Sequence, residues 1–376
     1  MKLISNPFVI GRYVDKAYFC DREKESELLV HHIVNGRHVT LMSERRLGKT
    51  GLIEHVFATQ LTNDYETFLI DIYTCKNLRE LVYLLANEVF KKIAKRQPSL
   101  LEKLLRFVRS LKTTISYDAV SGLPEIGLEM GEILQPEITL DELLNYLESS
   151  DKVCVVAIDE FQKIATFEED NMEALLRTKI QHLKKTQFIF AGSEQHLLES
   201  IFSDPARPFY NSVVFMQLLP IEQDKYIRFS QHLFSLYDKS VSEELVSRIY
   251  NCFSGVTWYL QLAMNEAFTL TERNGYVGLE AYGPILSHLV DAKRFTFEDR
   301  FRTLTEKQKS VLLAIAAEYP NEPEPTSQTF ITKYSLKTAS SVQMAIKGLI
   351  DKGFLYDRHG KKRPADLLLT LWLKRY

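Results

Sequence analysis

The chain has few cysteines and no long apolar segment. Its four cysteines, Cys20, Cys75, Cys154 and Cys252, are widely separated in 376 residues and form no C-x-x-C pair. Charged residues interrupt every apolar run well before the roughly 18–20 residues of a membrane span, and the first eight residues lack the apolar core of a secretory signal. A disulfide framework, a cysteine metal site and a membrane protein are therefore not expected, and we predict a cytoplasmic protein.

The sequence also lacks a strong charge of either sign. Its 47 Lys and Arg nearly balance its 49 Asp and Glu, for a formal net charge of −2. The whole chain therefore has no overall attraction to nucleic acid, and any basic surface must be local. Its length exceeds what a single simple core accommodates, so we expect two or three domains.

What the first part of the chain does contain is a series of short apolar segments that alternate with helical patterns. Continuous apolar runs of this length are typical of strands in a parallel sheet that is covered on both faces. The stretch 113–131 alternates instead and predicts an inserted hairpin with its turn at Ser121-Gly122. The predicted parallel strands are His38–Ser43, Thr67–Tyr73, Lys152–Phe161, Gln187–Ser193 and, as a fifth, Ser212–Leu219.

From Pro220 onward the pattern is helical, and a separate unit follows it. Three helices, the last of them Thr338–Lys352, precede an extended Phe354–Asp357, a basic turn and the apolar Leu367–Leu373. Three helices with a two-stranded ribbon are the outline of a winged helix-turn-helix. We therefore predict an α/β domain at 1–219, a helical lid at 220–302 and a winged helix at 303–376.

The loop after the first predicted strand carries a phosphate-binding motif. It matches G-x-x-x-x-G-K-[ST] except at its first position, where Ser43 replaces glycine, and it lies between a strand and a helix as the motif requires. Ser43 strains this loop only if its backbone needs the conformation that glycine favours. We expect Lys49 to contact the β- and γ-phosphates and Thr50 to bind Mg²⁺. The expected nucleotide-binding residues are Ser43, Glu44, Arg45, Arg46, Leu47, Gly48, Lys49, Thr50 and Gly51.

A second motif follows about a hundred residues later. The apolar segment from Val153 ends in Asp159-Glu160, the Walker B pattern of a strand that closes on two carboxylates. Asp159 is expected to hold Mg²⁺, and Glu160 to orient or deprotonate the attacking water. The strand predicted at Gln187–Ser193 ends in Ser193, which we expect beside the Walker B carboxylates as a sensor of the γ-phosphate, although Gly-Ser also ends many strands for turn reasons.

At these motifs the sequence resembles the archaeal-type ATPases of the STAND and AAA-like P-loop group. The resemblance extends to Asn6–Phe8 and Phe19–Glu25, which look like the family's N-terminal box, to Ser254–Leu260 in the lid, and to Ala365–Leu373 at the end. It implies bound ATP and Mg²⁺, a Walker B strand beside the P-loop strand, and Arg22 near the adenine. It also makes Arg207 a candidate for an arginine finger supplied in trans or for a lid contact, with a plain loop arginine as the alternative.

The C-terminal segment carries a local excess of positive charge. From Leu336 onward nine Lys and Arg face three Asp, and Arg358, Lys361, Lys362 and Arg363 cluster at the expected wing. Such a layout predicts salt-sensitive DNA contact without much sequence specificity, while docking on the ATPase or on a protein partner remains open. We therefore expect an ATP-hydrolysing molecular switch, and the alternatives are a DNA-binding regulator with a mainly structural nucleotide site and a protein-interaction scaffold. Besides ATP, the candidate partners are DNA, another protein and further copies of the chain in a homo-oligomer.

Overall fold

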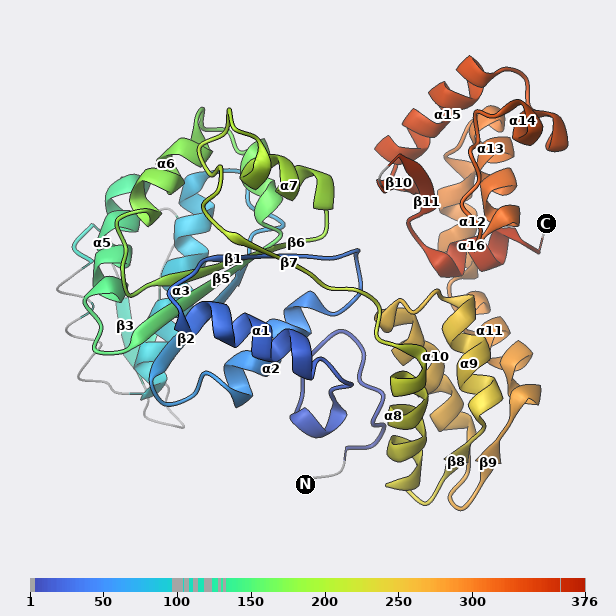
Figure 1. The fold of residues 1–376 in the computed structure, drawn as a ribbon, viewed down its shortest axis with the longest axis horizontal. Coiled ribbons are helices and arrows are strands. Elements are labelled where there is room, and N and C mark those ends of the chain that lie inside the picture. The colour runs from blue at the N-terminus through green and yellow to red at the C-terminus, as the bar shows by residue number, and fades with distance from the viewer. Residues whose placement is uncertain are drawn as a thin grey trace. The chain divides into compact units, whose positions relative to one another are not determined.

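The computed structural model describes residues 4–96, 104, 108–110, 114–117, 124–127, 130, 133–358 and 360–375. These residues form two compact units (Figure 1). One runs from Arg22 to Leu219, and the other combines the residues up to Asp21 with those from Pro220 onward. This division differs from the expected first domain at 1–219, because the first 21 residues pack with the helical unit. The expected boundary between residues 302 and 303 stays a prediction.

The Arg22–Leu219 unit is built on a five-stranded parallel sheet in the order β2-β5-β6-β1-β7. All five strands predicted from the apolar segments are present, which confirms the α/β fold. Their bounds are β1 Val39–Met42, β2 Tyr65–Asp71, β5 Val153–Asp159, β6 Gln187–Gly192 and β7 Val214–Gln217.

The strand order corrects one expectation that came from the family resemblance. The Walker B strand β5 does not lie beside the P-loop strand β1, because β6 pairs with both and separates them. A strand that follows β5 in the sequence has therefore been placed at the centre of the sheet. The consequence is that Ser193, which directly follows β6, lies between the P-loop and the Walker B carboxylates.

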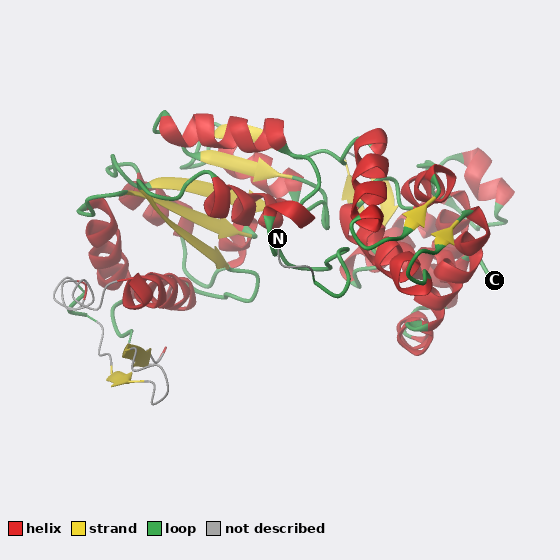
Figure 2. Cartoon of the chain, turned by 90° about the horizontal axis from the view of Figure 1, so that it is seen from below, coloured by secondary structure: helices red, strands yellow, loops and turns green. Residues whose placement is uncertain are grey.

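Helices cover both faces of this sheet (Figure 2). The main apolar core lies on one face, under α3, α5, α6 and α7, and the other face is covered by α1 and α2. An antiparallel pair formed by β3 (Thr114–Tyr117) and β4 (Pro124–Gly127) agrees with the predicted hairpin, whose Ser121-Gly122 turn lies outside the described residues. The helices are α1 Glu23–Val34, α2 Lys49–Thr59, α3 Leu78–Arg96, α5 Pro136–Glu148, α6 Met172–Ile180 and α7 Gln195–Ser203, with the 3₁₀ turn η3 at Phe161–Thr166.

The second unit begins with a helical part that the N-terminal segment completes. Phe8 is fully buried there, with its ring centroid 5.6 Å from that of Phe234 and 6.2 Å from that of Phe268. Asn6 and Asn265 add side-chain hydrogen bonds that tie this segment to α10. The helices are α8 Gln223–Ser235, α9 Glu243–Cys252, α10 Thr257–Leu270, α11 Tyr282–Asp291 and α12 Arg294–Arg302, with a short parallel pair β8 (Ser240–Val241) and β9 (Tyr276–Val277) and the 3₁₀ turns η1 Lys16–Tyr18 and η4 Leu279–Ala281.

The remainder of this unit has the winged-helix outline. Its elements are α13 Glu306–Glu318, α14 Gln328–Lys333, α15 Ala339–Asp351, the antiparallel strands β10 Leu355–Arg358 and β11 Lys361–Pro364, and α16 Leu367–Leu373. The apolar Leu367–Leu373 is thus a helix and not part of the ribbon, because Asp366 accepts hydrogen bonds from two backbone N–H groups at its start. In the part of the chain that the structure describes, no helix combines the length and the apolar character that crossing a bilayer requires.

Candidate functional site

The phosphate-binding loop connects β1 to α2 at the carboxyl edge of the sheet. Gly48 precedes α2 with φ +93°, a left-handed conformation that glycine adopts without strain. Ser43 is buried, continues the β1–β6 ladder through its N–H, and has no positive φ, so its replacement of glycine does not strain the backbone. Among the loop's other residues Arg46 has φ +69°, and the buried Leu47 anchors the loop to the core.

Lys49 is a buried cation at the first position of α2. Its side chain and backbone together are only 6% exposed, and among the described residues its ammonium group makes no hydrogen bond or ion pair. Burial lowers the pKa of Lys49, an effect that the nearby carboxylates of Asp159 and Glu160 partly offset. A buried, unpaired ammonium group beside helix N–H groups is suited to an anion such as a phosphate.

Thr50 and Asp159 supply two oxygen ligands from opposite sides of β6. The Thr50 hydroxyl donates to Asp159 Oδ2 at 2.5 Å, and Oδ1 of the same carboxylate accepts from the Glu160 N–H at 2.9 Å. Asp159 is 5% exposed, whereas Thr50 is exposed at the loop. Hydroxyl and carboxylate oxygens at this spacing are the hard ligands that Mg²⁺ prefers, so the residues present fit the expected metal.

Glu160 lies at the end of β5 with its carboxylate held by two donors. Ser193 Oγ lies 3.1 Å from Oε1 and 3.0 Å from Oε2 of Glu160, and Gln162 Nε2 donates to Oε2 at 2.5 Å. Glu160 itself adopts φ +56°, a left-handed conformation that is uncommon outside glycine. Such outliers occur at sites where the surrounding structure fixes a side chain for function.

Arg22 and Arg207 have partners within the Arg22–Leu219 unit. Arg22 is 3% exposed and precedes α1; one terminal nitrogen donates to Glu25 at 2.7 Å, and the other is buried without a partner among the described residues. Arg207 donates through Nε to Glu173 at 3.0 Å, through a second nitrogen to the same carboxylate, and to Ser200 at 2.6 Å. The structure therefore holds Arg207 in a fork with Glu173 and not at the P-loop. Arg45 is mostly exposed and forms an ion pair with Glu194 at 3.6 Å.

The wing of the second unit is less positive than its sequence indicates. Lys362 pairs with Asp357, and Arg363 pairs with Glu322 from the loop before α14. Lys361 is exposed beside Gly360, whose φ of +82° forms the turn between β10 and β11, and His359 lies outside the described residues. Two of the four cations expected to contact DNA are therefore already neutralised by carboxylates of the same unit.

Two residues that the sequence motifs did not indicate also lie at the Walker B edge. Gln162 follows Glu160 by two positions, but only its contact with Glu160 distinguishes it from any core glutamine. Asp71 ends β2 directly opposite Asp159 in the strand register. Burial raises the pKa of Asp71, the neighbouring carboxylates Asp159 and Glu160 add to this rise, and the hydrogen bond from the Tyr73 N–H opposes it. Asp71 lies near the end of the second predicted strand, Thr67–Tyr73, and a carboxylate in that position is the feature of the sequence that could have indicated its place at the site.

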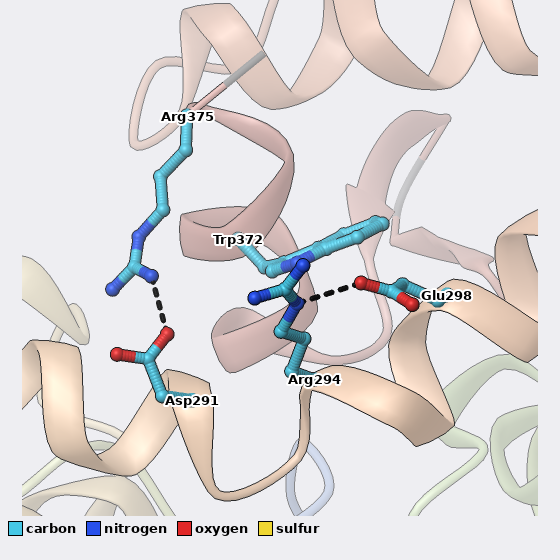
Figure 3. Close-up of a pocket in the computed structure, with 5 residues that line it drawn as sticks. All are labelled: Asp291, Arg294, Glu298, Trp372 and Arg375. Atoms are coloured by element: carbon cyan, nitrogen blue, oxygen red, sulfur yellow. Dashed lines mark hydrogen bonds and ion pairs between the residues drawn. The ribbon is translucent and has the colours of Figure 1, made fainter.

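Two surface cavities lie elsewhere. One, of about 560 Å³, lies between α7 and the carboxyl ends of β1 and β7, and its lining includes Glu199 and Asp204, which do not suit a phosphate. The other, of about 230 Å³, lies in the helical unit between α11, α12 and α16 (Figure 3). Its arginines are paired, Arg375 with Asp291 and Arg294 with Glu298. Among the residues that line these two cavities, none is a buried cation without a hydrogen bond or ion pair, as Lys49 is.

Comparison with known proteins gives a match to a family model and a match to a curated relative. A family model described as a probable winged helix domain matches residues 295–375. An uncharacterized ATP-binding protein of Methanocaldococcus jannaschii is 26% identical over 200 residues, which are 49% of this chain and 48% of that protein. The chain thus spans about half the length of the curated relative that it matches.

Solved structures match the fold over nearly the whole chain. A Walker-type ATPase of Pyrococcus abyssi has a TM-score of 0.65 at 17% identity and covers 98% of this chain and 99% of its own. The ORC2 protein of Aeropyrum pernix, solved with ADPNP and ADP, has a TM-score of 0.57 at 14% identity, covering 98% and 95%. These findings confirm the resemblance stated from the sequence: the chain has the fold of an archaeal-type P-loop ATPase with a C-terminal winged helix.

Proposed function

We propose that the protein is a molecular switch that binds ATP with Mg²⁺ and hydrolyses it. The observation that carries this proposal is the buried, unpaired Lys49 ammonium group at the N-terminus of α2. Leaving a cation in this state is costly unless an anion binds there, and the phosphates of a nucleotide supply that anion. The ATP-binding protein of M. jannaschii and the nucleotide complex of A. pernix ORC2 support the choice of ATP.

Thr50 and Asp159 would hold the magnesium ion, with their oxygen atoms already directed toward each other. When bound, Mg²⁺ neutralises charge on the phosphates and on the leaving group. The chain's own contribution is to keep the Asp159 carboxylate oriented through the Glu160 N–H. The loop from Ser43 to Gly51 would hold the phosphates through its backbone N–H groups. Gly48 leaves room for a close approach, because even a Cβ at this position would have no atom within 4 Å.

Glu160 would orient and deprotonate the attacking water as a general base. Ser193 binds both of its carboxylate oxygens from the central strand β6. In this position Ser193 can contact the γ-phosphate when the nucleotide is present and can couple it to the base. Phosphoryl transfer depends on such positioning more than on covalent chemistry by the protein.

The test is steady-state ATP hydrolysis with Mg²⁺ by the full chain, its Lys49→Ala and Glu160→Gln variants, and Lys76→Ala as an exposed-lysine control. We expect Lys49→Ala to abolish binding and turnover. Glu160→Gln should lower kcat by orders of magnitude while ATP binding survives. Equal turnover in wild type and Glu160→Gln would contradict the role of Glu160, and nucleotide binding unaffected by Lys49→Ala would contradict the site itself.

The winged helix is proposed to transmit the nucleotide state to a partner. Non-specific DNA contact through Arg358 and Lys361 is one candidate, with Lys362 and Arg363 contributing if their carboxylates release them. Docking on a protein is the other. Stimulation of hydrolysis by duplex DNA would favour the first, and its absence at low salt, together with a stable protein complex, would favour the second.

The remaining expectations are part of the same proposal. An arginine finger at Arg207, acting on a neighbouring copy in a homo-oligomer, requires release from Glu173. Arg22 is proposed to order the adenine end of the pocket through its unpaired nitrogen. The lid at 220–302 and the winged helix at 303–376 are proposed as separately moving domains. Cytoplasmic localisation is proposed as well, and all four cysteines being free thiols is consistent with it.

A further inference from the structure

Gln162 is a fully buried glutamine whose amide is only half satisfied. It is 1% exposed, its Nε2 donates to Glu160 Oε2, and its Oε1 is buried with no hydrogen-bond partner among the described residues. Exchanging the two amide atoms would direct Oε1 at a carboxylate and place two acceptors together. The hydrogen-bond network therefore fixes the orientation in which the amide donates to Glu160.

The space for this amide is made by Gly192 on the neighbouring strand. A Cβ at position 192 would lie 2.1 Å from Gln162 Oε1 and 2.7 Å from Leu198 Cδ1. Gly192 has no positive φ, so its backbone conformation does not call for glycine. Glycine at position 192 instead leaves space for the Gln162 amide, which lies where a side chain at this position would begin. The next residue is Ser193. The end of β6 therefore leaves space for Gln162, one hydrogen-bond donor to Glu160, and is followed directly by Ser193, the other donor.

We propose that Gln162, seated against Gly192, is the positioning residue of the general base Glu160. Ser193 lies at nearly equal distances from both carboxylate oxygens and does not by itself determine how the carboxylate is rotated. Gln162 binds only Oε2, so it fixes that rotation and leaves Oε1 to face the water. This inference rests on the proposed hydrolysis, and Gln162 acts through Glu160 without contacting the nucleotide.

The charged groups around this carboxylate come from three other elements. Lys49 from α2 attracts it, and Asp159 and Asp71, at the ends of β5 and β2, add negative charge nearby. None of these groups donates a hydrogen bond to Glu160 among the described residues. The donors that stabilise its ionised form through side chains are therefore Ser193 and Gln162.

The test compares Gln162→Met with Gln187→Met. Gln187 is a matched control because it is 4% exposed, also has a buried Oε1 without a partner among the described residues, and begins the same strand β6 at its far end. Methionine keeps the side-chain length and removes the amide. We expect Gln162→Met to lower kcat by about tenfold to a hundredfold, the effect of one hydrogen bond to a charged group, with KM for ATP unchanged.

Gln187→Met should leave kcat unchanged, whatever it does to thermal stability. Wild-type kcat in Gln162→Met, or equal kinetic losses in both variants, would overturn the proposal.

A readout without turnover separates this inference from the proposed function. In infrared spectra of ¹³C-glutamate-labelled protein, the band lost in Glu160→Gln identifies the Glu160 carboxylate. That band should shift in Gln162→Met and stay in place in Gln187→Met. If the shift occurs in a protein that hydrolyses no ATP, the proposed function has failed and the positioning contact stands. If hydrolysis depends on Glu160 and the band does not shift, the role of Gln162 is wrong.

The seat at Gly192 is tested by a double-mutant cycle. Gly192→Ala should displace the amide and lower kcat in the same way as Gln162→Met. Gln162→Ala removes the amide that the new Cβ at position 192 would contact. The double variant Gly192→Ala with Gln162→Ala should therefore lose less free energy of unfolding than the two single variants lose in sum. Additive losses of stability would show that the amide does not occupy the space beside position 192.

Discussion

The Thr50 hydroxyl donates to Asp159 Oδ2 at 2.5 Å, although Thr50 lies in α2, which follows β1, and Asp159 ends β5, and β6 separates those two strands. The hydrogen bond therefore spans the carboxyl end of β6. Because the partner of a buried carboxylate is costly to remove, this contact is expected to affect both the free protein and its metal-dependent affinity.

Thr50→Val keeps the shape of Thr50 and removes its hydroxyl. We expect ATP affinity with Mg²⁺ to fall by about tenfold to a hundredfold, as for a hydrogen bond to a charged group, and Thr50→Ser to retain most of it. Titration with a fluorescent ATP analogue, in Mg²⁺ and in EDTA, measures this effect. Wild type and Thr50→Val should bind equally in EDTA; a difference that persists there would mean that the hydroxyl does not act through the metal.

Lys49 makes opposite contributions to stability with and without nucleotide. Burial lowers its pKa below the ordinary value of 10.5, so the folded chain binds this proton less tightly than the unfolded chain does. The resulting loss of stability is greatest where Lys49 is charged and disappears as the pH rises from its lowered pKa through 10.5. Lys49→Met should therefore raise the free energy of unfolding without nucleotide, because it removes a cation whose burial outweighs the attraction of the nearby carboxylates.

The same substitution should remove the stabilisation that ATP gives. Ligand binding to the folded state raises Tm by mass action, and Lys49→Met is expected to show a higher Tm alone and no further rise with ATP and Mg²⁺. Differential scanning fluorimetry at neutral pH measures both, with exposed Lys76→Met as the control. A Lys49→Met protein that melts lower than wild type without nucleotide would contradict the interpretation that the cost of burying Lys49 exceeds the attraction of Asp159 and Glu160.

The wing gives a prediction in which an acidic residue opposes DNA binding. Arg363 is paired with Glu322, whereas Lys361 is exposed. If the winged helix contacts DNA, Lys361→Ala should weaken binding and reduce the salt slope by about one. Glu322→Gln should strengthen binding by releasing Arg363, and Arg363→Ala in that background should remove the gain. Fluorescence anisotropy with a duplex at several salt concentrations measures this; affinity unchanged in all three variants would favour protein docking.

Phe8 is expected to be essential to the helical unit. Truncating a fully buried phenylalanine costs about 3–5 kcal/mol, and Phe8 is 0% exposed among Phe234 and Phe268. Phe8→Ala should therefore lower the Tm of this unit and expose it to limited proteolysis, while Phe295→Ala, at a position 80% exposed, should change it little. Equal Tm values for the two variants would show that the N-terminal segment is dispensable.

The strands and the two nucleotide motifs could be predicted from the sequence because each is a local pattern. An apolar run that ends in Asp159-Glu160 is recognisable without knowing what lies next to it. The order of the strands is different, since an apolar run carries no record of which neighbour it pairs with. The expectation that β5 lies beside β1 failed for this reason: β6, which comes later in the sequence, pairs with both.

The residues that the sequence did not reveal act through distant partners. Gln162 becomes distinctive only when Gly192, thirty residues later, is known to lie against its amide. The pairing of Arg363 with Glu322 depends on the loop before α14, and it changes the charge that a count of Lys and Arg suggests. Leu367–Leu373 could have been recognised as a helix, because Asp366 before an apolar run is a typical helix cap.

The burial of Phe8 in the helical unit also means that Phe8 is synthesised well before the residues against which it packs. Phe8 leaves the ribosome early, but Phe234 and Phe268 follow more than two hundred residues later. At about 5–20 residues per second this interval lasts on the order of ten seconds or more. In that time the whole Arg22–Leu219 unit becomes available to fold, while the first 21 residues wait with an exposed phenylalanine. All five strands of the parallel sheet are therefore synthesised before the aromatic partners of Phe8.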